Sequence, residues 1–291
     1  MSSLLWNKLC ASHDYKHQVY RYEPDWRKYI KEGTLSATFP IAFVRIRHTG
    51  STSTIIFLNQ FFHHSFRQHL DLIADNKGVR RVDLLKNGHA GYWELMKHNR
   101  MMVTVKNGLS YTIVRNPFDW LVSSYFYYKT LRDHYGGFKY FALDWIEDKN
   151  KMPDIREDPG GGIYMREMCH QNIYTPIFES DQPGARCLIP VIIRYERLEE
   201  GLNKMLEQFN TGLPSTDQGF ASSRPIPHRN RSEHKKFNYK HYYEEDPVLG
   251  PKIVEGLLKK HAAEFEMFGY DFDGPIDDSV FINPANLILK Y

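Results

Sequence analysis

A short apolar segment that runs into glycine, serine and threonine constrains this chain more than any other feature. Residues 41–46 are Ile-Ala-Phe-Val-Arg-Ile, which predicts a buried strand. A Gly/Ser/Thr turn follows at 49–53, and the apolar spacing over 54–70 predicts an amphipathic helix. The N–H groups of such a turn and the positive end of the helix dipole can bind an anion. A capped helix start without a ligand has the same pattern, so this segment alone leaves both interpretations open.

A second strand and helix meet within residues 110–128. Tyr111–Val114 predicts a strand, Arg115 follows it, and Pro117 begins a helix at a position where proline is favoured. Ser123 lies eight positions after Arg115, so two helical turns bring its hydroxyl to the side of the strand end. An arginine fork and a hydroxyl can clamp a phosphate. A purely structural arginine is the alternative.

Strands and helices alternate along the rest of the chain. Further strands are predicted at 101–105 and 187–194, and helices at 163–178, at 198–209 and, as one or two helices, over 239–268. This alternation predicts an α/β fold, in which a central parallel sheet is flanked by helices in a single three-layer domain. The prediction for 1–291 is one domain with an N-terminal arm at 1–38, a core at 40–272 and a C-terminal tail at 273–291.

The two elements together resemble those of the sulfotransferases that use 3′-phosphoadenosine 5′-phosphosulfate as donor. In that family, a Pro-Lys-Ser/Thr-Gly loop binds the 5′-phosphosulfate, and an Arg-Asp/Asn-Pro element with a serine eight residues after the arginine binds the 3′-phosphate. The sequence is similar at Thr49–Ser53, Arg115–Pro117 and Ser123. Further similarity lies at 194–198, 228–232 and 268–272, so the resemblance covers about residues 40–272 in the same order. It implies the P-loop-like sulfotransferase fold, with motifs closest in style to the carbohydrate-type and bacterial branch.

The resemblance also implies a set of site residues. The donor would be bound by Arg47, His48, Thr49, Gly50, Ser51, Thr52, Ser53, Arg115, Ser123, Arg229 and Ser232. The family has a lysine where this chain has His48, and that lysine stabilises the charge that develops on the departing phosphate. Protonated beside phosphates, His48 can act as the cation or the acid. Arg47 or Arg45 is the alternative source of charge.

His89 is the predicted catalytic base, which accepts the proton of the acceptor hydroxyl. Gly88 and His89 resemble the Gly-His pair of the carbohydrate-directed branch, where the histidine has this role. A surface or supporting histidine is the alternative. The basic loop that holds Arg229 and Ser232 is either a solvated face or a flap that closes over the donor's 3′-phosphate.

Composition and missing motifs limit the other function classes. No lysine follows a glycine in the first loop, which disfavours a P-loop phosphoryl transferase. The net charge of +3 disfavours a polyanion-binding module, which remains the other alternative. Three widely spaced cysteines give neither a disulfide framework nor a zinc spacing, and we expect no metal cofactor.

The sequence also predicts the localisation and the binding partners of the protein. No sustained apolar segment is present, which predicts a cytoplasmic protein without a membrane or nucleic-acid partner. The expected partner is a small-molecule or carbohydrate acceptor, and a homodimer is compatible with the sequence. Seven aromatic side chains either contact that acceptor or fill the core: Tyr127, Tyr128, Tyr135, Phe138, Tyr140, Trp145 and Tyr164.

Overall fold

The structure, a computed structural model, describes part of the chain in two compact units. The described residues are 24, 41–44, 46, 48–51, 53–54, 57, 109–147, 153, 174, 177–180, 182–212, 226 and 237–289. Unit 1 comprises Met1–Tyr20, Arg115–Ile173 and Arg231–Asp278, and unit 2 comprises Arg21–Val114, Tyr174–Asn230 and Ser279–Tyr291. Each unit collects separate segments of the chain, and each is described by itself.

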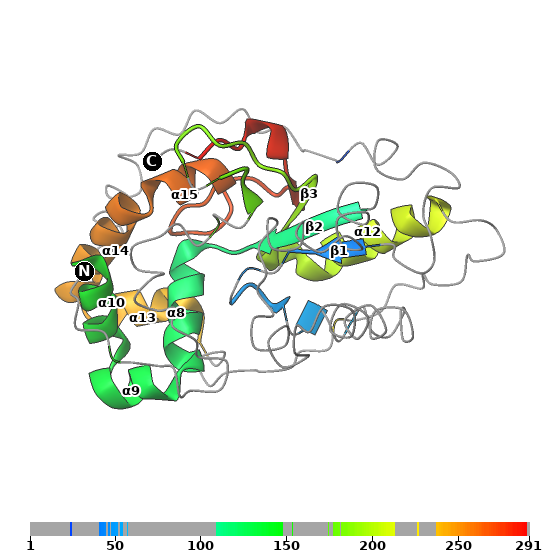
Figure 1. The fold of residues 1–291 in the computed structure, drawn as a ribbon. Coiled ribbons are helices and arrows are strands. Elements are labelled where there is room, and N and C mark those ends of the chain that lie inside the picture. The colour runs from blue at the N-terminus through cyan, green and yellow to red at the C-terminus, as the bar shows by residue number, and fades with distance from the viewer. Residues whose placement is uncertain are drawn as a thin grey trace, which may run out of the picture. The chain divides into compact units, whose positions relative to one another are not determined.

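Unit 2 is built on a sheet whose strands run in the order β1-β2-β3-β4, and Figure 1 labels β1, β2 and β3. The strands are β1 at Ile41–Phe43, β2 at Leu109–Val114, β3 at Val191–Arg194 and β4 at Phe281–Ile282. β1 and β2 are parallel, as are β2 and β3, while β4 pairs antiparallel with β3. The described part of the chain is therefore a mixed α/β structure, and the predicted parallel pairing is confirmed for three of these strands.

Burial of apolar side chains along β2 and β3 explains why these segments form central strands. Tyr111, Ile113 and Ile192 are fully buried, and β3 is buried along its whole length, as is usual for parallel strands. Helix α12 at Leu198–Gly212 follows β3 through the 3-10 turn Tyr195–Arg197. A Cβ at Gly201 of α12 would lie 2.4 Å from Cγ2 of Ile193, so this glycine lets α12 approach the sheet closely.

Part of the segment 273–291, which the sequence predicts as a C-terminal tail, pairs with the sheet. Phe281 and Ile282 form β4, and a 3-10 turn follows at Pro284–Asn286. Beyond this turn, Leu287 and Leu289 are buried, and backbone bonds join both to the segment 185–187.

The described part of unit 1 is helical. Its helices are α8 at Pro117–Tyr127, α9 at Lys129–Tyr135, α10 at Phe138–Ile146, α13 at Tyr239–Glu244, α14 at Leu249–Lys260 and α15 at Ala262–Phe268 (Figure 1). Buried aromatic rings hold them together. Phe118 of α8 lies edge-on to Tyr243 of α13, with ring centroids 5.3 Å apart, and contacts Phe265 of α15 at 4.9 Å. The first turn of α8 is thus at the centre of this core.

Several predicted boundaries need correction. The strand predicted at 41–46 ends at Phe43, and the helix predicted from Thr54 already begins at Ser51. The strand predicted at 187–194 begins at Val191, because Pro190 has no N–H to donate to a ladder. Cys187 instead forms an isolated antiparallel bridge with Phe178.

Two helix predictions also need correction. The helix predicted at 163–178 does not reach its expected end, since Ile177 lies in a 3-10 turn and Phe178 in the bridge. Residues 239–268 contain three helices rather than one or two. The strand predicted at 101–105 lies outside the described residues.

Candidate functional site

The first candidate half-site follows β1 in unit 2. Val44 continues the pairing beyond the end of β1, because its N–H donates to the Tyr111 carbonyl at 2.9 Å. The hydroxyl of Thr112 in β2 donates to the Val44 carbonyl at 2.8 Å. These two bonds fix the point at which the chain leaves the sheet and enters the Gly/Ser/Thr turn.

The turn itself is shaped by two left-handed backbone conformations. The φ angle is 59° at His48 and 80° at Gly50. Histidine adopts this conformation more readily than most side chains, and glycine adopts it without a steric cost. Thr49 between them is fully buried, and its hydroxyl donates to the Ile46 carbonyl at 2.9 Å. Thr49 therefore uses its hydroxyl proton within the turn.

A helix begins directly after the turn. The Gly50 carbonyl accepts bonds from both the N–H and the hydroxyl of Thr54, each at 3.1 Å. Gly50 is thus the residue that caps this helix, and Ser51 is its first helical residue. The first N–H groups of a helix point toward its N-terminal end, where they and the helix dipole favour an anion.

The absence of a side chain at Gly50 is required by packing. A Cβ added there would lie 2.7 Å from Cε2 of Tyr195 and 3.2 Å from Cδ2 of Leu198. Tyr195 and Leu198 come directly after β3 and belong to the Arg-Tyr-Glu-x-Leu segment noted in the sequence. This segment therefore packs against the turn at Gly50, a contact that the sequence pattern did not reveal.

The second candidate half-site follows β2 and begins unit 1. Arg115 is only 4% exposed, and its Nε–H donates to Oδ2 of Asp119 at 2.7 Å. Asn116 caps α8, since its Oδ1 accepts from the Phe118 N–H at 2.9 Å, and Pro117 occupies the first helical position. Sequence reasoning identified Arg115 but missed Asp119, although an arginine and an aspartate four residues apart across a helix start are a recognisable signal.

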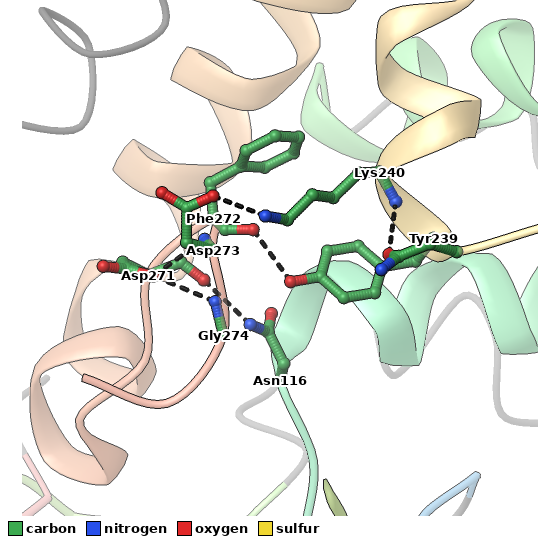
Figure 2. A network of polar contacts seen from close by, with 8 residues as sticks. Asn116, Tyr239, Lys240, Asp271, Phe272, Asp273 and Gly274 are labelled. Carbon is green, nitrogen blue, oxygen red and sulfur yellow. Dashed lines mark hydrogen bonds and ion pairs between the residues drawn. The ribbon is translucent and has the colours of Figure 1, made fainter. Parts of the chain in front are cut away.

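Asn116 also ties the start of α8 to a turn that follows α15. Its Nδ2 donates to the Asp271 carbonyl at 2.8 Å, as Figure 2 shows. The Asp271 carboxylate in turn accepts from the N–H groups of Asp273 and Gly274, at 2.7 and 3.0 Å. Burial raises the pKa of the Asp271 carboxyl above its usual value. Hydrogen bonds within the turn thus hold the Asp271 carbonyl where it accepts from the cap residue Asn116.

Residues of α13 contact the same turn. The hydroxyl of Tyr239 donates to the Phe272 carbonyl at 2.8 Å, and Lys240 pairs with the Asp273 carboxylate (Figure 2). The hydroxyl of Tyr243, further along α13, donates to the Phe118 carbonyl at 2.9 Å. Residues of α13 and of the turn after α15 therefore hold the first turn of α8 in place.

The two neighbouring serines of α8 have different surroundings. Ser124 is fully buried, and its hydroxyl donates to the Trp120 carbonyl at 2.9 Å. Ser123 is half-buried and lies one helical turn beyond Asp119. Ser123, the predicted phosphate contact, is therefore the serine whose side chain reaches the surface of the helix.

The predicted donor residues divide between the two units. His48, Thr49, Gly50, Ser51 and Ser53 are described in unit 2, and Arg115 and Ser123 in unit 1. The other predicted site residues lie outside the described residues; these are Arg47, Thr52, His89, Arg229 and Ser232. Their predicted roles stay predictions.

The aromatic side chains expected either at an acceptor or in the core fall into both groups. Tyr128 and Trp145 are almost fully buried, so they are core residues. Tyr127 and Tyr140 are 44% and 51% exposed, which leaves their rings accessible to a ligand.

The described residues do not support a metal site or a nucleophilic cysteine. That part of the chain contains no group of three or more histidine, cysteine, aspartate or glutamate side chains able to hold a metal ion. Burial raises the pKa of the Cys187 thiol to about 12, so the thiolate needed for nucleophilic chemistry is disfavoured. None of the helices in the described part of the chain combines the length and the apolar composition that crossing a membrane requires.

Comparisons with protein-family models, with curated proteins and with solved structures found no match to this chain. The functional argument therefore rests on the two half-sites themselves.

Proposed function

We propose that this protein is a sulfotransferase, which moves a sulfuryl group from 3′-phosphoadenosine 5′-phosphosulfate to a hydroxyl or amine of a small-molecule or carbohydrate acceptor. The observation that carries the proposal is the start of α8. There a buried, ion-paired arginine follows a strand, and Ser123 lies on the accessible side of the helix two turns later. An arginine fork with a nearby hydroxyl is suited to a phosphate monoester such as the donor's 3′-phosphate.

The turn after β1 supports the same proposal for the other end of the donor. Its left-handed residues and the helix start at Ser51 present backbone N–H groups, which suit the 5′-phosphosulfate. His48 stands where the family has a lysine and, protonated, would stabilise the departing phosphate. Each half-site is thus assigned to one anionic end of the donor.

The sheet topology supports the finer fold assignment, a P-loop-like three-layer domain. Three adjacent strands are parallel, and each leads at its carboxyl end into one of the sequence motifs: β1 into 48–51, β2 into 115–117 and β3 into 195–198. In open α/β sheets, ligands bind beyond the carboxyl ends of the strands.

The proposed reaction is an in-line displacement at sulfur. The acceptor oxygen or nitrogen forms a bond to sulfur while the bond between sulfur and the bridging phosphate oxygen breaks. Adenosine 3′,5′-bisphosphate leaves with that electron pair, and the acceptor's proton passes to a base. His89 is the proposed base for a hydroxyl acceptor.

Ligand-induced thermal stabilisation tests the donor assignment. We expect adenosine 3′,5′-bisphosphate to raise the melting temperature, because a ligand at about 100 times its Kd stabilises the native state by about 2.7 kcal/mol. ATP and a DNA duplex serve as the comparison ligands. An equal response to ATP would favour a phosphoryl transferase, a response to DNA alone would favour a polyanion-binding module, and no response to the bisphosphate would exclude the proposal.

Donor-dependent sulfation of an acceptor panel, read by mass spectrometry, tests the reaction. His89→Ala should abolish turnover of a hydroxyl acceptor and leave bisphosphate binding unchanged. His134→Ala, which removes an exposed histidine on α9, is the matched control and should retain turnover. Full turnover by the His89 variant would remove the assignment of the base without affecting that of the donor.

A further inference from the structure

Arg115 forms an ion pair with the carboxylate of Asp119 at the start of α8. Arg115 and Asp119 have side chains that are 5% and 17% exposed, and the Nε–Oδ2 distance between them is 2.7 Å. A bond this short between opposite charges is a charge-assisted hydrogen bond, which is stronger than a neutral one. Both groups are largely withdrawn from water, so the pair is not a solvent-screened surface contact.

Asp119 accepts a hydrogen bond from one particular nitrogen of Arg115, and this bond determines how the guanidinium group is oriented. The bond uses Nε, at the inner edge of the planar guanidinium, and not one of its two terminal nitrogens. Phosphates are recognised by paired N–H groups of an arginine fork, and fixing one edge of a planar group fixes the direction of the other. Asp119 therefore sets the direction in which the terminal nitrogens of Arg115 point.

The arrangement of α8 places this pair on the same side as Ser123. Most of the helix is buried, and its buried residues are Pro117, Phe118, Trp120, Leu121, Val122, Ser124 and Tyr125. Asp119 and Ser123, four residues apart, are both half-buried and share the remaining face. Asp119, which binds Arg115, and Ser123, the predicted phosphate contact, thus lie one helical turn apart on the same partly exposed face of α8.

We infer that Asp119 is a positioning residue for the 3′-phosphate: it orients Arg115 so that the terminal guanidinium nitrogens face the phosphate beside Ser123. This inference rests on the proposed function, since it needs a ligand with a 3′-phosphate. Asp119 acts through Arg115 and does not contact the ligand.

Two other roles for Asp119 make different predictions. A carboxylate in the first turn of a helix stabilises that helix through its dipole, and such a role would affect the fold and all ligands equally. A carboxylate beside Arg115 could also compete with the phosphate, in which case its removal would strengthen binding. Only a positioning role predicts a loss that is confined to ligands with a 3′-phosphate.

The test compares two nucleotides that differ only in that group. Titration calorimetry on the full chain would measure the Kd of adenosine 3′,5′-bisphosphate and of adenosine 5′-monophosphate. The variants are Asp119→Asn, the milder Asp119→Glu, and Asp133→Asn as the control, which makes the same change in an exposed i,i+4 pair on α9. Circular dichroism would check that each variant is folded.

We expect Asp119→Asn to weaken bisphosphate binding roughly tenfold, because asparagine replaces the charge-assisted bond to Arg115 by a weaker bond to a neutral amide, with monophosphate binding changed less than about twofold. Asp119→Glu keeps the charge and should show a smaller loss with the same selectivity. Equal losses on both nucleotides, or tighter bisphosphate binding, would overturn the inference while the donor assignment stands. If the unaltered protein does not bind the bisphosphate, the proposed function and the inference both fail.

A double-mutant cycle adds a second check. Arg115→Lys replaces the fork by a point charge without an Nε–H. If Asp119 acts through that N–H, Asp119→Asn should weaken bisphosphate binding much less in the Arg115→Lys background than in the unaltered protein. Additive losses would show that Asp119 acts independently of Arg115 and would overturn the positioning role.

Discussion

The two helix starts on which the proposal rests are stabilised by different kinds of group: backbone groups at one and side chains at the other. At Ser51, the turn is made by the backbone, through left-handed conformations at His48 and Gly50 and a carbonyl of Gly50 that accepts two bonds. At Pro117, the start is made by side chains, because Asn116 caps the helix and Asp119 holds Arg115.

This difference predicts how each site tolerates change. The binding proposed for the turn uses backbone N–H groups and depends mainly on conformation, which is compatible with His48 at the position of the lysine in the sulfotransferases that the sequence resembles. Its strict requirement is the lack of a side chain at Gly50, where Tyr195 and Leu198 leave no room. The start of α8 instead depends on the chemical identity of each polar side chain. Four substitutions test this contrast, from the largest expected effect to the smallest.

Gly50→Ala should have the largest effect. A left-handed alanine costs about 1 kcal/mol, and the overlap of its Cβ with Tyr195 adds roughly 1–3 kcal/mol to the loss of unfolding free energy. Gly184→Ala is the matched control, because its φ of +87° is similar but a Cβ would meet nothing within 4 Å. Urea denaturation would compare the two variants, and equal losses would contradict the packing role of Gly50.

Asn116→Asp should lower the unfolding free energy by about 2 kcal/mol, within the usual range for a buried polar group left without its partner. The aspartate keeps the bond from the Phe118 N–H but places a carboxylate oxygen against the Asp271 carbonyl. Asn238→Asp, at the exposed cap of α13, should change stability by less than about 0.5 kcal/mol. A tolerated Asn116→Asp would show that the Asp271 bond is dispensable.

Tyr243→Phe should cost about 1 kcal/mol of unfolding free energy, the usual value of one hydrogen bond. The ring contacts with Phe118 remain, and only the bond to the Phe118 carbonyl is lost. Tyr239→Phe removes a partly buried bond to the Phe272 carbonyl and should cost less, because water can replace the lost donor there. Thermal denaturation would compare the loss of stability in the two variants. A larger loss for Tyr239→Phe than for Tyr243→Phe would argue against the stabilisation of α8 by side chains.

Asp271→Asn should have the smallest effect and the opposite sign. Burial raises the pKa of this carboxyl above 3.8, so the folded protein binds its proton more readily than the unfolded chain does. The charged form therefore costs stability at neutral pH, and this cost disappears as the pH falls below 3.8.

An asparagine at 271 can still accept both turn bonds, so the variant should melt slightly above the unaltered protein at pH 7. The gain should shrink as the pH is lowered toward 3. Asp273→Asn, which breaks the ion pair with Lys240, should give no gain at pH 7. A pH-independent difference at Asp271 would contradict the assigned cause.

The sequence predicted the features that depend on local patterns. Short apolar runs predicted β1, β2 and β3, and proline after Arg115 predicted the start of α8. β4 was missed because Phe281–Ile282 is too short to show an alternating pattern. The contacts of Gly50 with Tyr195 and of Asn116 with Asp271 join residues far apart in the sequence, so no local pattern could predict them.

The position of β4 affects the order in which the protein can fold during synthesis. Phe281 and Ile282 complete the sheet of unit 2 but follow every helical segment of unit 1 in the sequence. On the ribosome, β3 must therefore wait for about 90 more residues before its antiparallel partner is made. Pairings between distant segments fold slowly, so the nascent sheet has a long period in which its β3 edge is open to chaperones or to misassociation.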